Sequence, residues 1–364
     1  MSRPEPQKRG AQDQRVVKLL LPLPLIRAMD RLLVDGVGGF TTRNEFVREA
    51  IESYILELTH EPAPAEPAAL VRHARGRLTV APTLLDPGQP ELFAEQPQDE
   101  LAGPLSLEET ALPPLPADVS VVAGGADVVE EPLFGMHNRD YPSLWAARRL
   151  ADYDVRGPLG FDEFAERATE EAWGFAEAIR PLEGALGQKL TALFPTNHEK
   201  RQTASSAFRT FAIGSIAPSP GKVRAEGPLF LWRVIDVERR DGGVVVGLTP
   251  RGWELLERLA GLTVASPHPP ERARIFIAYL REHAPADCWG FERALSAAAE
   301  RPTRAELVET FRAARPDWRD SVAATNAQGY VARAREWGLI APKVVDGRYE
   351  LTELGAELAK GVAK

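Results

Sequence analysis

One predicted β-strand, at residues 15–21, constrains this chain more than any other feature, because no second strand follows closely enough to pair with it. Its residues are rich in β-forming side chains, and prolines at 22 and 24 end the strand. Apolar positions then recur at helical spacing over residues 25–33, and glycines end that helix. A second helix opens at Thr42, whose hydroxyl can cap it, and carries a wide apolar stripe to residue 58.

A strand and two short helices bury too little apolar surface to fold alone. The simplest partner is a second copy of the same chain, with the two strands paired antiparallel about a twofold axis, so that every inward residue contributes twice. The sequence therefore predicts an obligate homodimer held together by residues 15–60, with a polar tail at residues 1–14.

The order of elements in residues 15–60 and a short signature in the second helix carry a family resemblance. The strand and its proline are followed by a helix with Met29-Asp30-Arg31-Leu32, a glycine-containing turn, and then Thr41-Thr42-Arg43-Asn44-Glu45-Phe46-Val47-Arg48-Glu49-Ala50-Ile51. This arrangement, over about the first sixth of the chain, resembles the ribbon-helix-helix family, the Arc-like and CopG-like DNA-binding proteins. The resemblance implies that the paired strands enter the major groove and that the second helix offers its first amides to a phosphate. The residues expected to contact DNA are then Arg15, Val16, Lys18, Leu20, Thr41, Thr42, Arg43 and Asn44.

Two outward strand residues depart from that family, in which such residues are usually polar. Val16 and Leu20 cannot form a hydrogen bond with a base, although apolar side chains can contact thymine methyl groups. Lys18 and Arg15 are the polar contacts that the strand offers. An alternative is therefore that residues 15–60 mainly dimerise the chain while a downstream part reads DNA.

Residues 61–132 are acidic, rich in proline and alanine, and without a sustained helical or strand period. We expect them to form a linker, although a short apolar patch at residues 119–122 could dock on a domain or a strand edge. They carry a net charge of −10, whereas the whole chain carries −8. The rest of the chain is therefore near neutral, which permits DNA binding without indicating it strongly.

From residue 133 the sequence shows amphipathic helical periodicity and can be divided into two units, 133–262 and 263–364. In the first unit we expect helices at 141–153, 161–179 and about 199–211, a hairpin that pairs 229–235 with 244–248, and a helix at 253–259. In the second we expect helices at 272–283, 303–315 and 321–337, a hairpin at 340–352 that turns at Asp346-Gly347, and a final helix.

Helices followed by a hairpin and a closing helix resemble the winged helix-turn-helix domain, more closely in residues 263–364. In that family the helix before the hairpin can enter the major groove, and the hairpin flanks it. The resemblance implies that exposed residues Ser321, Thr325, Asn326, Gln328 and Arg333 face the groove, with Lys343 and Arg348 near phosphates. Winged-helix domains also serve purely as protein-interaction modules, and the acidic residues Asp317 and Asp320 favour that alternative.

The sequence does not indicate chemistry beyond binding. The six histidines are scattered without partners at ligand spacing, so we expect no metal and no other cofactor. No catalytic constellation can be assembled, so we do not expect an enzyme. Cys288 is the single cysteine, which excludes an intramolecular disulfide and fits a reducing cytoplasm. No apolar run approaches the ~20 residues of a membrane span, and we expect a cytoplasmic, nucleoid-associated protein.

These patterns predict a mainly α fold with short β elements, in which an N-terminal ribbon-helix-helix module precedes tandem winged-helix-like α+β domains. The function they indicate is that of a homodimeric, sequence-specific DNA-binding protein that regulates transcription, with double-stranded DNA and a second copy of the chain as partners. The alternative is a partition or structural DNA-binding adaptor, or an antitoxin-like protein, whose C-terminal half recruits a protein partner.

Overall fold

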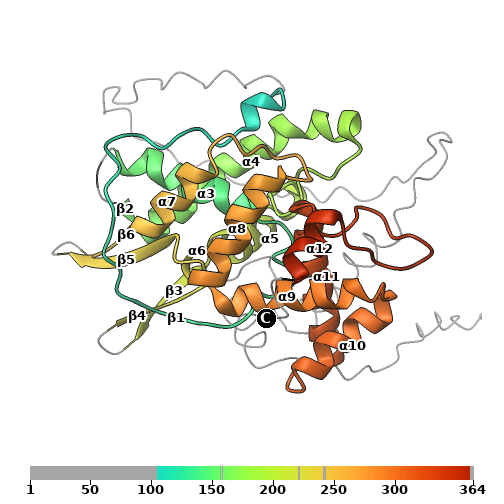
Figure 1. Cartoon of the computed structure of the whole chain (residues 1–364). Coiled ribbons are helices and arrows are strands. Elements are labelled where there is room, and N and C mark those ends of the chain that lie inside the picture. Colours follow the sequence, from blue (N-terminus) through green and yellow to red (C-terminus); the bar gives the residue numbers. More distant parts are fainter. Residues whose placement is uncertain (1–104, 156, 158, 220–221, 241–242, 361–364) are drawn as a thin grey trace, which may run out of the picture. The chain divides into compact units, whose positions relative to one another are not determined.

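The computed structural model describes residues 105–155, 157, 159–219, 222–240 and 243–360 (Figure 1). Helices predominate in this part of the chain, and its strands are short and form two three-stranded sheets. This confirms the predicted mainly α architecture with short β elements. The predicted ribbon-helix-helix module, the tail before it and residues 61–104 of the predicted linker lie outside the described residues.

Two long helices, α3 (Tyr141–Asp154) and α4 (Phe161–Leu186), pack against each other and confirm the helices predicted at these positions. α4 is longer than predicted, because it ends only where Gly187 takes a left-handed conformation with φ 61°. The predicted polar helix at about 199–211 is present as three consecutive short pieces, which are η3 (His198–Lys200), α5 (Arg201–Phe208) and η4 (Arg209–Ile213).

The described strands form two sheets, each with its own strand order. One has the order β2-β6-β5 and consists of β2 (Leu159–Gly160), β6 (Gly243–Leu248) and β5 (Ile235–Arg240). The other has the order β1-β4-β3 and consists of β1 (Ala126–Val128), β4 (Lys222–Glu226) and β3 (Ser215–Ser219). β5 and β6 form a hairpin with Ile235 opposite Leu248 and Arg240 opposite Gly243.

The prediction that residues 229–235 form the first strand of a hairpin is wrong for most of that range. Residues Pro228–Leu231 form a short helix, α6, and all four are buried. An apolar run that is buried on every side carries no period, so the pattern does not distinguish a strand from a buried helical turn. Pro228 at the first helical position favours the helix, and β5 begins only at Ile235.

Residues 105–132 pack on the rest of the described chain, although the sequence predicts a linker there. The backbone N–H of Val122 donates to the carbonyl of Leu248 at 2.8 Å, and β1 pairs in parallel with β4. A short helix, η2 (Glu108–Thr110), leads to Leu112, which is 2 % exposed. The apolar residues of this segment thus dock on strand edges, whose unpaired backbone groups they satisfy.

From residue 250 to residue 360 the regular elements are helices. They are α7 (Pro250–Arg258), α8 (Pro270–His283), α9 (Pro285–Ala299), α10 (Arg304–Ala314), α11 (Asp320–Glu336) and α12 (Glu353–Lys360). The sequence predicts all of these except α9. Between α11 and α12 lies the predicted hairpin, in which Val345 bridges Arg348 and the turn residues Asp346 and Gly347 have φ 51° and 71°.

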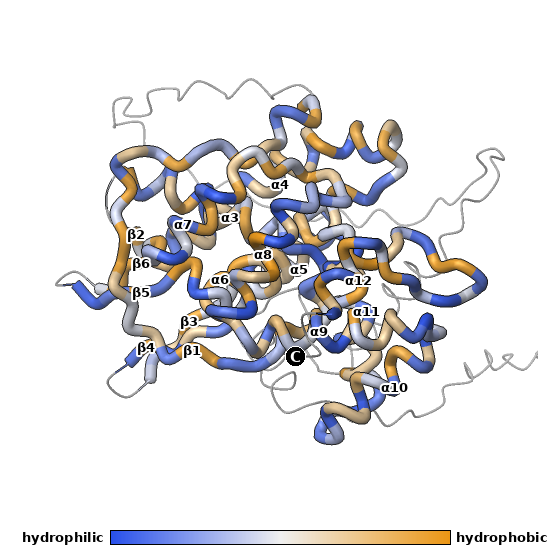
Figure 2. Tube along the Cα trace, viewed as in Figure 1, coloured by the Kyte–Doolittle hydropathy of each residue, from blue (hydrophilic) through white to orange (hydrophobic). Residues whose placement is uncertain are grey.

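One apolar core runs through the described chain and includes residues from α3 to α12. It crosses position 262, where the sequence suggests a boundary between two units, because Leu259 and Leu262 belong to the same core as Phe276 and Leu280 of α8. Hydrophobic and hydrophilic stretches alternate along most of the helices, as expected for helices with one buried face (Figure 2).

Candidate functional site

Five charged side chains lie together in the interior, where α11 meets α9 and the start of α3. They are Arg139, Asp140, Asp287, Arg333 and Glu336, termed here the buried ionic cluster, and each is less than a tenth exposed. Charged residues are almost never buried to this extent unless they are paired. The cluster is therefore the most unusual chemical feature of the described chain.

Arg333 of α11 joins two carboxylates. Its Nη1 and Nη2 donate to Oδ1 and Oδ2 of Asp287 at 2.7 and 2.6 Å, and its Nε donates to Oδ1 of Asp140 at 2.6 Å. The rings of Phe291 and Tyr330 lie 4.6 and 5.1 Å from its guanidinium carbon. Burial by itself would lower the pKa of Arg333, but the two carboxylates outweigh burial and raise it, so Arg333 is charged.

The same carboxylates accept hydrogen bonds from other buried donors. The partners of Asp287 are the Tyr330 hydroxyl at 2.7 Å and the Trp232 indole at 2.8 Å, and those of Asp140 are the Trp337 indole at 2.6 Å and the His137 ring at 2.8 Å. Burial alone would raise the pKa of Asp287, but Arg333 holds it below its ordinary value. Asp287 is thus stabilised as an anion.

The ends of three helices favour this distribution of charge. Asp140 directly precedes α3 and Asp287 lies in the first turn of α9, where the partial positive charge of a helix N-terminus stabilises an anion. Arg333 lies in the last turn of α11, where a cation is stabilised. Aspartates at helix starts and an arginine at a helix end are the local sequence signal for the cluster.

Glu336 extends the cluster by one helical turn. Its Oε2 accepts a hydrogen bond from the backbone N–H of Asp140 at 2.5 Å, and its Oε1 accepts one from Nε of Arg139 at 3.0 Å. Arg139 also donates to the carbonyls of Leu190 and Val264 at 2.7 and 2.6 Å. Burial by itself would raise the pKa of Glu336, but Arg139 and the surrounding donors lower it from 4.5 to about 2.

The lowered pKa of Glu336 predicts that acid destabilises the fold. The charged carboxylate stabilises the folded chain fully above pH 4.5, and this contribution is lost as the pH falls toward 2. We expect Glu336 to account for a loss of about 2 kcal/mol in the free energy of unfolding between about pH 6 and pH 3. Glu336→Gln removes this titration, so the variant should lose correspondingly less over the same interval.

Urea titrations monitored by tryptophan fluorescence test the expected acid effect. All seven tryptophans lie between residues 145 and 337, so the signal reports on the described part of the full-length chain. Equal losses in the wild type and in Glu336→Gln would show that the carboxylate of Glu336 is not stabilised in the folded state.

The buried ionic cluster is enclosed rather than open to a substrate. None of its residues lines either of the two grooves that flank α10. Within the described ranges, no three His, Cys, Asp or Glu side chains gather as a metal ion would require. No described helix combines the length and the apolar composition that crossing a membrane needs. The geometry therefore assigns the cluster to holding three helices together.

The structure corrects part of the predicted DNA-contacting surface. Asn326 and Arg333 were expected to be exposed on α11, but they are 3 % and 1 % exposed, so the prediction is wrong for both. The amide oxygen of Asn326 accepts a hydrogen bond from the backbone N–H of Gly135 at 2.8 Å, and Arg333 is held in the buried ionic cluster. These two polar groups are used by the fold itself.

Other expected contacts of the C-terminal unit remain closer to the surface. Ser321, Lys343 and Arg348 are exposed, but Nη1 of Arg348 donates to a backbone carbonyl at 2.8 Å. Thr325 and Gln328 are half-buried, and the hydroxyl of Thr325 donates to the carbonyl of Ser321 at 2.8 Å. The expected contacts of the strand and second helix lie outside the described residues: Arg15, Val16, Lys18, Leu20, Thr41, Thr42, Arg43 and Asn44.

The segment around Gly135 crosses α11, and this crossing explains why the helix offers so little polar surface. Gly135 lies so close to α11 that a Cβ there would overlap the backbone of Thr325 and Asn326. Gly329 on the helix meets the same segment, because a Cβ added to it would come within 2.5 Å of the Cα of Gly135. Phe134 lies beside this crossing and is 37 % exposed. The crossing thus covers one face of the helix that was expected to enter the groove.

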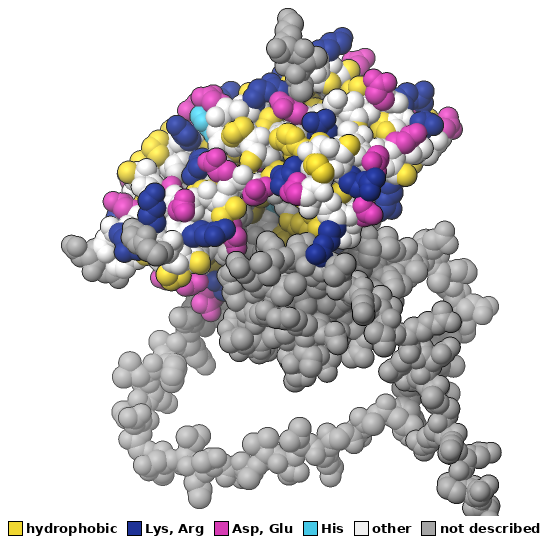
Figure 3. Space-filling view, turned by 90° about the horizontal axis from the view of Figure 1, so that it is seen from below, with side chains coloured by type: hydrophobic (Ala, Val, Ile, Leu, Met, Phe, Trp, Pro, Cys, Tyr) yellow, Lys and Arg dark blue, Asp and Glu magenta, His cyan; other side chains and the backbone are white. Residues whose placement is uncertain are grey.

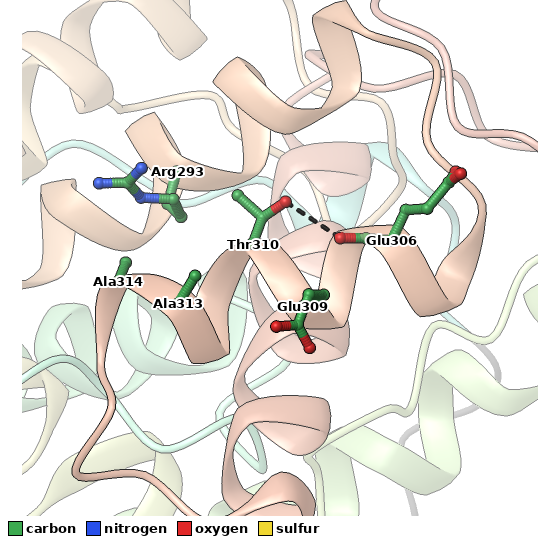
Figure 4. Close-up of a pocket in the computed structure, with 6 residues that line it drawn as sticks. All are labelled: Arg293, Glu306, Glu309, Thr310, Ala313 and Ala314. Atoms are coloured by element: carbon green, nitrogen blue, oxygen red, sulfur yellow. Dashed lines mark hydrogen bonds between the residues drawn. The ribbon is translucent and has the colours of Figure 1, made fainter.

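Two open grooves flank α10. The first has a volume of about 580 Å³ and is lined by Arg293, Glu306, Glu309, Thr310, Ala313 and Ala314 (Figure 4). The second has a volume of about 590 Å³ and is lined by Arg304, Ala305, Val308, Glu309, Arg312 and Asp320. Both contain charges of both signs.

Positive and negative side chains are interspersed on the face of the described chain shown in Figure 3. The charges there do not form a region of one sign. DNA-binding surfaces collect basic residues, because they must neutralise several phosphates. This face therefore lacks the electrostatic character of a DNA-binding surface.

Cys288 is expected to be unreactive in the folded protein. It is buried in α9, and burial, together with the nearby Glu292, raises the pKa of its thiol to about 12. Because only the thiolate reacts with aromatic disulfide reagents, native protein should react far more slowly than protein in urea. The chain has one cysteine, so the absorbance of the released thiolate reports this site alone. Immediate reaction of the native protein would contradict the burial of Cys288.

Comparison of the chain with protein-family models, with curated proteins and with solved structures found no match.

Proposed function

We propose that this chain is a homodimeric DNA-binding regulator that contacts DNA through residues 15–60 and recruits a protein partner through its C-terminal part. The first half of the proposal rests on the strand-helix-helix pattern and the phosphate-binding signature Thr41-Thr42-Arg43-Asn44. The second half rests on the structure described above.

The observation that supports recruitment is the burial of Asn326 and Arg333 of α11. A recognition helix reads bases with exposed amides and guanidinium groups. Asn326 and Arg333 are the residues of α11 best suited to that task, and both are hydrogen-bonded inside the fold. Of the α11 residues that the resemblance assigns to the groove, two hydroxyls and one half-buried amide remain nearer the surface, those of Ser321, Thr325 and Gln328, which limits sequence specificity.

The order of elements also supports a winged-helix-like module used for protein contact. α9, α10 and α11 are followed by a hairpin and α12, and Thr303 before α10 bridges Arg348 of the hairpin. The hairpin tip exposes Val344 and Val345, which are 48 % and 43 % exposed. Apolar side chains at a tip suit a protein surface better than a phosphate backbone.

Sequencing the DNA fragments that co-purify with full-length protein from its host tests the proposal. We expect enrichment of specific fragments with the wild type and its loss, by at least about tenfold, in Lys18→Ala/Arg43→Ala, because each substitution occurs twice in the dimer. The matched variant Ser321→Ala/Lys343→Ala should retain the enrichment. Light scattering on each protein checks that the dimer persists.

Three outcomes would overturn parts of this proposal. If the wild type enriches no fragments, it does not bind DNA specifically. If the variant of Ser321 and Lys343 loses the enrichment and that of Lys18 and Arg43 keeps it, the C-terminal part reads DNA. A wild-type monomer in dilute solution would remove the paired strands on which the DNA contact depends.

A further inference from the structure

We propose that the groove between α9 and α10 binds a peptide segment of a partner protein, with a carboxylate of the peptide paired to Arg293 and a bulky apolar side chain on the floor formed by Ala313 and Ala314. The groove is the first of the two described above, termed here the α9–α10 groove. This inference rests on the proposed recruitment function and specifies its surface and the chemistry of the partner.

An aromatic pair adjoins the groove at Arg293, because Trp289 lies near the Arg293 guanidinium and Trp318 packs on Trp289. Trp289 of α9 and Trp318 of the turn before α11 pack edge to face, with ring centroids 5.7 Å apart, and both are half-buried. Trp289 also packs edge to face on buried Phe311 at 5.8 Å, which fixes its ring. Rigid, partly exposed tryptophans beside arginines are the side chains that most often dominate binding energy at protein interfaces.

Arg293 is held in place but has no carboxylate partner in the described chain. It lies one helical turn after Trp289, with its guanidinium carbon 5.8 Å from the centre of that ring. Its Nε is buried without a hydrogen-bond partner, and its guanidinium points away from the carboxylate of Glu306 (Figure 4). A guanidinium already ordered by stacking loses little further freedom when it binds a carboxylate through its terminal nitrogens.

The acidic residues of the groove are already neutralised. Glu309 receives hydrogen bonds from Nε and Nη2 of Arg312 at 2.8 and 3.0 Å. Glu306 caps the start of α10 through the backbone N–H of Thr303 at 2.7 Å and lies 3.4 Å from Arg348. The groove therefore presents one available cation beside an apolar floor.

A peptide fits these features better than nucleic acid. Nucleic acid binding requires several cations to neutralise successive phosphates, and Arg293 is the one cationic side chain among the residues that line this groove. A peptide can place a single carboxylate on Arg293 and an apolar side chain against Ala313, as in recognition of short linear segments by grooves between helices. The open groove of about 580 Å³ accommodates such a side chain together with its backbone.

Selection of peptides from a random phage-displayed library on immobilised full-length protein tests the proposal. We expect the enriched peptides to share Asp or Glu close to Leu, Phe or Trp. A synthetic peptide of the enriched sequence should bind the wild type and bind Arg293→Glu and Arg293→Gln at least about tenfold more weakly, as measured by fluorescence anisotropy.

Arg304→Glu provides the matched control. Arg304 lies on α10 in the second groove, and its substitution changes the net charge by the same amount as Arg293→Glu. It should leave peptide affinity within about twofold. Thermal unfolding monitored by tryptophan fluorescence checks that the Arg293 variants are folded. If the charge reversal perturbs the fold, Arg293→Gln, which keeps much of the side-chain length, provides the test.

The proposal is overturned if no acidic and apolar motif is enriched, or if the selected peptide binds the Arg293 and Arg304 variants equally well. DNA capture distinguishes this failure from failure of the proposed function. Arg293→Glu should retain the enriched DNA fragments, so loss of peptide binding with intact DNA enrichment separates the two surfaces. If the Arg293 variants lost binding of nucleic acid but kept binding of the peptide, the proposal would likewise be overturned.

Discussion

Replacing Arg333 by alanine is expected to destabilise the C-terminal part by about 3–5 kcal/mol, a large share of the ~5–15 kcal/mol that stabilises a typical domain. The substitution leaves the carboxylates of Asp140 and Asp287 buried without their cation, and it removes the stacking partner of Phe291 and Tyr330. Urea unfolding of the full-length chain, followed by tryptophan fluorescence, measures the loss.

Arg274→Ala is the matched control for this prediction. Arg274 also makes a two-point contact with a carboxylate, that of Glu357 at 3.0 and 2.7 Å, but both side chains are about half exposed. Water and salt screen such a pair, so its loss should change the unfolding midpoint little. Equal effects of the two substitutions would mean that Arg333 acts as an ordinary surface residue, contrary to its burial.

Replacing Gly135 by alanine should destabilise the fold by about 3 kcal/mol, at the upper end of the cost of overpacking. A Cβ at this position would overlap the carbonyl of Thr325, and the overlapped atoms belong to the backbone of a helix, which cannot turn aside as a side chain can. The crossing segment must therefore lift away from α11. This would also break the hydrogen bond from Gly135 to Asn326. Thermal or urea unfolding measures the effect.

Gly174→Ala should change the free energy of unfolding in the opposite direction and stabilise the fold. Gly174 is exposed within α4, and a Cβ there meets no atom within 4 Å. Alanine has a higher helix propensity and restricts the unfolded chain, so a gain of up to about 1 kcal/mol is expected. If Gly135→Ala were as well tolerated as Gly174→Ala, the close crossing on α11 would not exist in solution.

The helices that the sequence predicts are those with a sustained amphipathic period. α3, α8, α10 and α11 have bounds within a few residues of the prediction. The turn at Asp346-Gly347 is equally local, because its left-handed conformations suit those two residue types. Such features depend on residues that are neighbours in the chain.

Two of the features that the sequence missed, α6 and the docked segment at residues 105–132, lack a period of their own. α6 is buried on all sides, so its apolar residues do not alternate with polar ones. The docked segment at residues 105–132 reads as a linker because it is acidic and rich in proline. Its order comes from the strand edges and apolar surfaces that it meets, which belong to distant parts of the chain.

The buried ionic cluster shows the same limit of prediction from the sequence, because its contacts are long-range. Asn326 and Arg333 occupy positions on α11 where a polar residue indicates an exposed face. Their partners lie far away in sequence, since Asp140 is 193 residues from Arg333 and Gly135 is 191 residues from Asn326. A helical pattern cannot reveal that such partners exist.

The sequence alone determined where most helices form and which of their faces are apolar, because these depend on contacts within a few residues. Only the tertiary structure decided which polar side chains face solvent and which serve the interior. A guanidinium or an amide is buried at low cost when distant carboxylates and backbone groups satisfy it, and exposed when they do not. That choice depends on long-range packing, and it places Asn326 and Arg333, two of the residues expected on the exposed face of α11, in the interior.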